Sequence, residues 1–152
     1  MTTMETEILE ADFQLGFTYT RSPGEIMGKF LAALKQQQLY GIKANDGKVL
    51  FPPTEYDPRN SDALNDFVPV KETGTLLYWT WIEKPRDHHM IDQPFAFGLV
   101  QLDGADTPFL HRVLADSADA LSRGMQVKLQ WEENRVGAIT DIRGFIANTG
   151  AA

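Results

Sequence analysis

The sequence has no cysteine among its 152 residues. That absence excludes disulfides, a thiolate nucleophile and a cysteine-ligated zinc site. Long apolar runs are missing too, since a stretch such as 95–100 is far shorter than the roughly 18 residues that a membrane-spanning helix needs. The segment 1–12 is acidic and no apolar stretch follows it, so we expect no signal peptide. These features predict a cytoplasmic protein that does not contact a membrane.

Basic side chains are outnumbered by acidic ones. The chain has 14 Lys and Arg residues against 21 Asp and Glu residues, a formal net charge of −7, and no two basic residues are adjacent. Nucleic-acid binding depends on attraction between cations and phosphates and shows as a basic face. We therefore expect no nucleic-acid partner.

The residues that are present are typical of one globular domain. The chain weighs 17.1 kDa, and its residues are 43% apolar and 23% charged, a balance that excludes wholesale disorder. Residues 1–20 mix acidic and aromatic side chains without a steady period, so we expect a mostly extended arm, mobile over its first ten residues. The expected divisions are an arm (1–21), a helix with a hairpin knuckle (22–66), a barrel (67–147) and a tail (148–152).

The clearest local pattern predicts an amphipathic helix from about Pro23 to Gln38. Ser22 and Glu25 have the spacing of a capping box, with Pro23 at the first helical position. The apolar side chains that recur every four residues are Ile26, Phe30 and Leu34. This recurrence places them on one face of the helix.

A small hairpin is predicted after the helix. The turn sequence Asn45-Asp46-Gly47 separates two short runs, 39–43 and 48–51. Pro52-Pro53 then ends the hairpin. We call this region, 40–66, the knuckle.

From Phe67 onward, strand patterns follow one another. A lead-in at 67–70 contains Pro69 and is therefore not a central strand. The strands expected after it are 75–82, 95–102, 108–114, 126–131 and 136–145, with a short helix at 116–122. A mainly β fold of five strands, with a helix between the third and the fourth, is the order of an OB-fold barrel.

No residue pattern gives a convincing nucleophile or general base. Asp87-His88-His89 lies in a predicted loop, and adjacent imidazoles diverge, so an exposed polar loop explains it better than a metal site. Asp103, Asp106 and His111 would supply carboxylates and an imidazole for acid–base chemistry. A turn at Asp103 and a half-buried, hydrogen-bonded His111 explain these residues more simply. Phosphate-binding glycine motifs and hydrolase motifs are absent.

The tryptophans leave two interpretations open. Trp79 and Trp81 share one face of their predicted strand, and Trp131 is placed to join them. OB barrels stack nucleobases on such aromatic side chains, but the acidic charge disfavours that use here. The stripe is therefore either part of the core or part of an interface.

The order of helix, knuckle, double proline and barrel resembles that of the thiolase-associated OB-fold proteins. In that family, the domain of unknown function 35 type, a rubredoxin-like zinc ribbon precedes the barrel. The stretches that carry the resemblance are 30–34, 47–53, 74–81, 94–104 and 124–127. They span nearly all of the chain between Phe17 and Phe145. The resemblance implies an N-terminal helix and a degenerate zinc-ribbon hairpin, followed by the barrel.

Family members carry two cysteine pairs in the ribbon. The resemblance places those four positions at Lys43, Asp46, Asp57 and Asn60. Protonated lysine does not ligate zinc, and Asp and Asn are poor replacements for thiolates in a tetrahedral structural site. We therefore expect no metal, and a knuckle held by its turns and packing alone.

Within the family, the chain resembles most the zinc-less branch that includes the OB-fold partners of steroid side-chain aldolases. The residues that carry this closer likeness are 17–22, 52–58, 80–81 and 102–107. It implies a non-catalytic subunit that binds a thiolase-like catalytic subunit in a hetero-oligomer acting on acyl-CoA thioesters. The implied reaction is retro-aldol cleavage of a β-hydroxyacyl-CoA side chain. With a thiolase as partner it would be carbon–carbon bond formation or thiolysis.

Two sets of site residues follow from this resemblance. CoA phosphates need cations, and the nearest candidates on the predicted loops are Lys43, Lys48, Arg59, Lys84 and Arg86. The residues expected at a partner interface are Ile26, Met27, Phe30, Leu31 and Tyr56. For the helix, covering the barrel's own core is an equally good explanation.

Two other classes of function stay open. One is a stand-alone OB-fold module that binds an oligonucleotide or a small ligand. The other is an enzyme in its own right, such as an acyl-CoA hydratase, which would need an acid–base pair.

Overall fold

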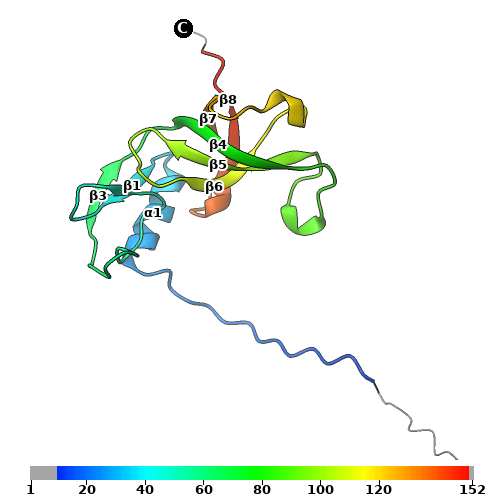
Figure 1. Cartoon of the computed structure of the whole chain (residues 1–152). Helices are drawn as coiled ribbons and strands as arrows, with labels where there is room; N and C mark the ends of the chain where they lie inside the picture. Colours follow the sequence, from blue (N-terminus) through cyan, green and yellow to red (C-terminus); the bar gives the residue numbers. More distant parts are fainter. Residues whose placement is uncertain (1–9, 151–152) are drawn as a thin grey trace, which may run out of the picture.

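The computed structural model describes residues 10–150. They form one helix, a small three-stranded sheet and a closed five-stranded barrel (Figure 1). The predicted mainly β, OB-type architecture is confirmed. Between residues 10 and 150, no helix has the length and apolar character needed to span a membrane. The predictions for 1–9, including most of the mobile start of the arm, and for 151–152 of the tail lie outside the described residues.

Helix α1 (Glu25–Lys35) is shorter than predicted and begins differently. Gly24 precedes it with φ 86°, in the left-handed region that favours glycine, and no side chain caps the first turn. The Ser22 hydroxyl accepts a hydrogen bond from the Gly24 N–H at 3.3 Å instead. The predicted capping box is therefore wrong. The apolar stripe is confirmed, because Ile26, Phe30 and Leu34 are buried.

Three short strands form the sheet of the knuckle. They are β1 (Tyr40–Lys43), β2 (Val49–Leu50) and β3 (Asp66–Pro69), in the order β2-β1-β3. Both pairings of β1 are antiparallel, and Ile42 lies between Leu50 and Phe67. The predicted hairpin is therefore confirmed, and the lead-in strand β3 completes its sheet.

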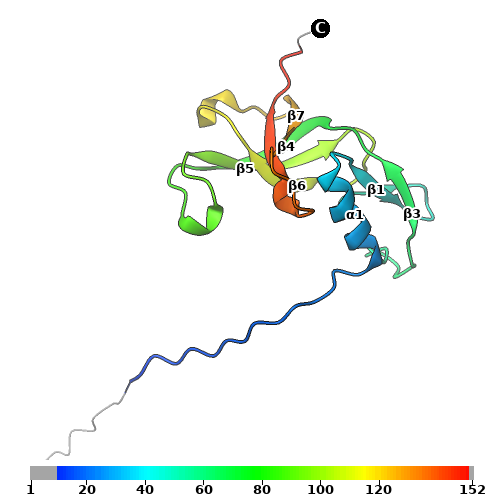
Figure 2. The same cartoon turned by 180° about the vertical axis from the view of Figure 1, so that it is seen from behind.

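The barrel follows in the order β4-β5-β6-β8-β7, and β7 pairs with β4 to close it. Its strands are β4 (Thr73–Ile82), β5 (Phe95–Leu102), β6 (Phe109–Val113), β7 (Gln126–Trp131) and β8 (Ile142–Ala147). Neighbouring strands are antiparallel except β6 and β8, which meet in parallel at Val113 and Phe145. Figure 2 shows α1 against the barrel, with the 3-10 turn η3 (Ile139–Asp141) next to it.

Two predicted elements differ from the structure. The helix expected at 116–122 is only the single 3-10 turn η2 (Ala118–Ala120). The strand expected at 136–145 is a loop, then the 3-10 turn η3 (Ile139–Asp141), and only then β8. The buried Asp141 carboxylate holds this loop, because it accepts hydrogen bonds from the N–H groups of Val136, Gly137 and Ala138 at 2.8–3.2 Å. Because the N–H groups of residues 136–138 donate to this carboxylate, they are not available for the hydrogen bonds of a β-sheet.

One apolar core connects the helix, the knuckle and the barrel. Phe30 of α1 meets Phe51 of the knuckle edge-on at 5.7 Å, and Phe51 meets Phe109 of β6 at 5.1 Å. All three rings are buried in the same cluster. A second, smaller cluster fills the knuckle around Ile42, between α1 and the short sheet. The knuckle is therefore fixed to the barrel through shared side-chain packing.

Candidate functional site

The two loops of the knuckle are joined by Arg59. Its guanidinium contacts Asp46 in the first loop at 2.5 Å and Asp57 in the second at 2.7 Å. The Nε of Arg59 and its backbone N–H both donate to the other Asp57 oxygen at 2.9 Å. Asp57 is buried, although it is acidic. The prediction that turns and packing alone hold the knuckle is therefore wrong, because an ion-pair cluster also joins its loops.

This cluster lies at the positions where the resemblance implied zinc ligands. Lys43 is exposed, and Asn60 is bonded to Asp62 of its own loop. The two carboxylates that remain are engaged by Arg59, a cation that repels a metal ion. In the part of the chain between residues 10 and 150, no three His, Asp or Glu side chains are grouped to hold a metal. The donor set does not fit zinc.

Charge pairing shifts the ionisation of the cluster. Hydrogen bonds from Arg59 lower the pKa of Asp46 to about 2. The same side chain lowers the pKa of Asp57. The two carboxylates in turn raise the pKa of Arg59. All three groups are therefore charged at neutral pH.

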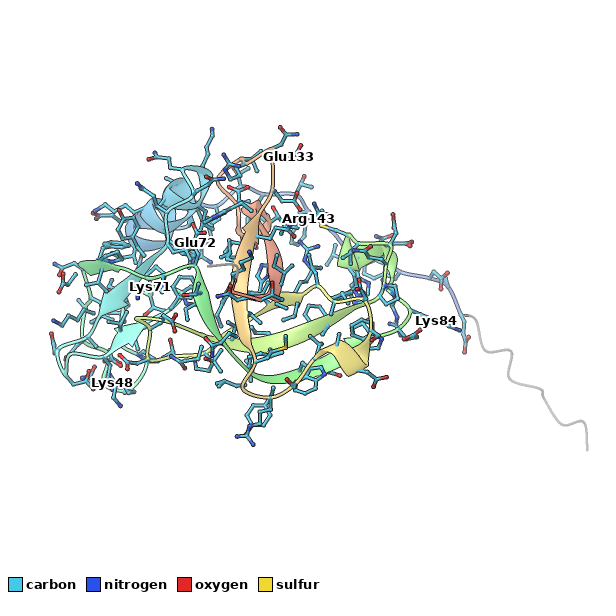
Figure 3. All side chains as sticks on the ribbon, turned by 90° about the horizontal axis from the view of Figure 1, so that it is seen from above. Lys48, Lys71, Glu72, Lys84, Glu133 and Arg143 are labelled. Atoms are coloured by element: carbon cyan, nitrogen blue, oxygen red, sulfur yellow. The ribbon has the colours of Figure 1, made fainter. Side chains whose placement is uncertain are left out.

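The five cations proposed to bind CoA phosphates do not gather in one place. Lys48 in the knuckle and Lys84 in the β4–β5 loop lie at opposite ends of the molecule (Figure 3). Arg86 belongs to the same loop as Lys84, and it precedes the 3-10 turn η1 (Asp87–His89). Arg59 is already paired with two carboxylates. The five residues therefore form two separate groups, and their role stays a prediction.

The five residues expected at a partner interface differ in how far they are buried. Ile26 and Phe30 are buried in the chain's own clusters, so neither presents a free surface. Met27 and Leu31 are half-buried against the main core. Tyr56 is 59% exposed. An interface at Met27, Leu31 and Tyr56 stays a prediction.

All three histidines of the chain line one cleft of about 410 Å³. His88 and His89 come from η1, His111 comes from β6, and Phe97, Leu110 and Ile139 supply its apolar lining. Sequence reasoning did not join these histidines, because they meet only when the β4–β5 loop folds over β6. The nearest signal was the His88-His89 pair itself.

His111 is held in the neutral form. Burial lowers the pKa of His111 to about 4, and the charge of Arg112 acts in the same direction. Its Nδ1 is buried and has no hydrogen-bond partner among residues 10–150. The expectation that His111 is hydrogen-bonded is therefore wrong for this atom. A neutral imidazole with an unused nitrogen suits the lining of a binding cleft.

A polar groove continues from the histidine cleft. Its cavities measure about 480 Å³ and 490 Å³. Arg112 and Arg143 line both, together with Glu132, and Arg112 also lines the histidine cleft. Figure 3 shows Arg143 and Glu133 on the same part of the barrel surface. Sequence reasoning missed both arginines, because they lie on strands rather than on the predicted loops.

The acids considered for catalysis are engaged elsewhere. Asp103 accepts a hydrogen bond from the Thr73 hydroxyl at 2.5 Å. Asp106 accepts one from the Val49 N–H at 2.7 Å and so attaches the barrel to β2. Neither contacts His111. Residues 10–150 therefore assemble no carboxylate–imidazole pair from these three side chains.

The tryptophan stripe is half-buried. Trp79, Trp81 and Trp131 all pack against the main core. The indole N–H of Trp81 donates to Glu83 at 2.6 Å, and that of Trp131 donates to Glu72 at 3.0 Å. The rings therefore contribute to the core from its edge, with polar groups directed to the surface.

The fold and these sites define a class of protein: an OB-fold barrel that carries a ribbon-like knuckle joined by an arginine. Residues 67–132, from β3 to the start of the β7–β8 loop, match the family model described as the ChsH2 C-terminal OB-fold domain. This part of the chain is similar to that family. The resemblance noted from the sequence is therefore confirmed.

Solved structures share the wider fold. One, described as an Ltp2-ChsH2(DUF35) aldolase, aligns with 78% of this chain and 91% of its own, at a TM-score of 0.60 and 22% identity. Another, a DUF35-family protein of unknown function from Sulfolobus solfataricus, aligns with 66% of this chain and 74% of its own, at a TM-score of 0.53 and 18% identity. No curated protein matches the chain. At such identities the likeness establishes the fold alone.

Proposed function

We propose that this chain is a non-catalytic OB-fold subunit of a thiolase-superfamily complex that acts on acyl-CoA thioesters. The reaction is retro-aldol cleavage of a β-hydroxyacyl-CoA, with a steroid-type side chain as the substrate class. The thiolase-like partner subunit holds the catalytic residues. The alternative within this class is an accessory subunit of an acyl-CoA thiolase or acetyltransferase.

The observation that carries the proposal is the ChsH2-type barrel at 67–132. The likeness to the aldolase structure extends over 78% of the chain and so includes more than the barrel. The protonation and hydrogen bonding of the candidate acid–base groups agree with an accessory role for this chain. His111 is neutral and unpaired at Nδ1, and Asp103 and Asp106 are bonded to groups other than His111. Such an arrangement supplies no proton relay of its own.

The test is a reconstituted assay. The full chain, the thiolase-like subunit purified with it, and the two together are each incubated with a β-hydroxyacyl-CoA. The proposal predicts cleavage to a ketone or aldehyde and a shorter acyl-CoA only when the catalytic subunit is present, at a rate that rises when this chain is added. Cleavage of the β-hydroxyacyl-CoA by the isolated chain would contradict the proposal. It would also be contradicted if adding this chain did not change the cleavage rate of the catalytic subunit.

A second candidate function is supported by the histidine cleft. A cavity of about 410 Å³ with a mainly apolar lining is of the size that holds a small ligand. A stand-alone binding module would use that cleft without a partner. Binding of an acyl chain to the isolated chain, abolished by Leu110→Glu, would favour this function over the accessory one.

A further inference from the structure

The arm before α1 carries a row of exposed apolar side chains. Phe13, Leu15, Phe17 and Tyr19 are each between 71% and 86% exposed. The residues between them, at 14, 16 and 18, are polar or small. The period of two is clear in 13–19, although the window 1–20 as a whole has no steady period. The arm runs away from the barrel as a single extended segment (Figures 1 and 2).

This spacing suits a strand and not a helix. On a strand, alternate side chains point to the same face, so all four apolar side chains share one side. On a helix, residues two apart are separated by about 200° and the four would lie on opposite sides. Thr18, Thr20 and the aromatic residues also favour extended backbone. The segment 12–20 is therefore suited to form a strand with one apolar face, about 30 Å long.

The arm has no hydrogen-bond partner in the part of the chain that the structure describes. Between residues 10 and 150, no hydrogen bond involves the segment 10–20. The barrel is closed and offers no free edge. The outer edge of β2 is covered, because Asp106 and Thr107 bond to Val49 and Phe51. The edge that remains, on β3, is four residues long and ends in Pro69, which has no N–H to donate.

A second copy of the chain is a poor receptor for the same reasons. It offers the same edges, and both copies carry a net charge of −7. The first twelve residues contain Glu5, Glu7, Glu10 and Asp12 and no basic residue. Charge complementarity therefore favours a different protein with basic side chains near its binding edge.

We propose that residues 12–20 bind the thiolase-like subunit as an added β-strand. They pair with an unpaired sheet edge of that subunit and lay Phe13, Leu15, Phe17 and Tyr19 into an apolar groove beside it. Backbone pairing supplies the register, and the alternate side chains supply the specificity. This inference rests on the proposed function, since the partner is the catalytic subunit named there.

The test uses the full chain with a C-terminal tag, so that the arm is free. One variant replaces Phe13, Leu15, Phe17 and Tyr19 by Ser. The matched control replaces Gln14, Thr18 and Thr20 by Ser, on the opposite face. Because the arm does not contact the folded body, both variants should keep the wild-type Tm. The affinity of each for the purified thiolase-like subunit is then measured by calorimetry.

The inference predicts that the four-serine variant binds at least about 100-fold more weakly, while the control binds within about threefold of wild type. Equal binding by the two variants would overturn the arm's role and leave the proposed function standing. Failure of the wild-type chain to bind any thiolase-like subunit would overturn both. A wild-type dimer that the four-serine variant abolishes would show that a second copy is the receptor, against the inference.

Amide hydrogen exchange of the arm tests the mode of binding. An added strand predicts protection of every second amide between residues 12 and 20 in the complex, and fast exchange throughout the arm in the free chain. Protection of consecutive amides, as in a helix, would contradict strand addition even if the arm proved essential.

Discussion

Arg59 shows what a single side chain contributes when the ligands of a ribbon are replaced. A guanidinium has a planar fork of donors that can engage two carboxylates at once. Here it joins the loop of Asp46 to the loop of Asp57. The ion pairs of Arg59 form only while Asp46 and Asp57 are ionised. Their contribution to the stability of the knuckle therefore depends on pH and not on a metal.

Replacing Arg59 by Met leaves the buried Asp57 beside Asp46 without a countercharge. We expect a Tm several degrees below wild type at pH 7, and Arg59→Lys to recover only part of the loss. The pKa of Asp46 is about 2, below its ordinary 3.8. Its stabilisation is therefore complete above pH 3.8 and is lost as the pH falls toward 2.

Thermal unfolding of wild type and Arg59→Met between pH 7 and pH 2.5 measures this. The gap between the two Tm values should narrow below pH 4. A constant gap over the whole range would mean that the cluster does not stabilise the knuckle through charge.

Metal removal should have no effect on the knuckle. Its donor positions are Lys43, Asp46, Asp57 and Asn60, and none is a thiolate. We expect the same Tm in excess EDTA and in added zinc, within about 1 °C, whereas a structural zinc site would respond strongly. A rise in Tm with zinc would contradict the assignment of these positions.

His111 makes a second residue-scale prediction. Its pKa is about 4 in the folded chain, below the ordinary 6.5, because burial disfavours the imidazolium. The free energy of unfolding is therefore unaffected by this group above pH 6.5. It decreases as the pH falls toward 4, because the unfolded chain takes up the proton more readily than the folded chain. This loss is about 2 kcal/mol between pH 7 and pH 5.

Urea unfolding of His111→Phe tests this value. The variant has no group to titrate, so its stability should change less than that of wild type between pH 7 and pH 5. His88→Phe is the matched control, because it replaces an exposed histidine of the same cleft. Parallel curves for wild type and His111→Phe would contradict the buried, neutral imidazole.

At the scale of elements, α1 is attached to the barrel through the β7–β8 loop. Arg135 donates from Nε to the Lys35 carbonyl at the end of α1, at 3.1 Å. Gly137 lies close to the same helix, since a Cβ built there would be 3.5 Å from the Leu31 carbonyl oxygen. Asp141 holds this loop in shape through three backbone N–H groups.

Removing the Asp141 carboxylate should loosen the loop and the helix together. Burial alone would raise the pKa of Asp141, but the three N–H donors outweigh it and lower the pKa. We expect Asp141→Ala to cost about 3 kcal/mol, and Asp141→Asn, which keeps one acceptor, to cost less. Chemical denaturation gives the free energies. Hydrogen exchange should show faster amides at 136–138 and in α1, and unchanged exchange there would contradict the coupling.

The element scale also shows how far the sequence predicts the fold. The apolar stripe of α1, the knuckle hairpin and the strands β4, β5 and β7 follow from local periodicity and turn residues. The start of α1 was missed because Gly24 takes a left-handed conformation that a capping pattern does not reveal. The β7–β8 loop was missed because Asp141 competes with strand pairing for its neighbours' N–H groups.

The candidate sites were harder to predict, because tertiary contacts assemble them. Arg59 was expected to bind a ligand phosphate, but it pairs with two acids brought together by the knuckle. The histidine cleft combines η1 with β6 and η3, which are far apart in the sequence. Local sequence patterns do not show which residues far apart in the chain come together in the folded structure.

At the scale of the whole molecule, the two groups of free cations can be tested separately. Lys43 and Lys48 lie in the knuckle, and Lys84 and Arg86 lie in the β4–β5 loop. If one group binds CoA phosphates, neutralising that pair to Gln should raise the KM for the CoA thioester about tenfold and leave kcat unchanged.

The other pair serves as the control, because Lys48 and Lys84 lie at opposite ends of the molecule (Figure 3). The effect should also weaken as the salt concentration rises. An unchanged KM for both double variants of the complex would contradict phosphate binding by these residues.

The proposed function requires that the chain associates with a catalytic subunit. The most direct measurement is affinity purification of the C-terminally tagged chain from its native host, followed by mass spectrometry and determination of the molar mass. We expect a thiolase-like protein in stoichiometric amount and the mass of a hetero-oligomer. Elution of the chain alone, as a monodisperse protein of about 17.1 kDa, would contradict it.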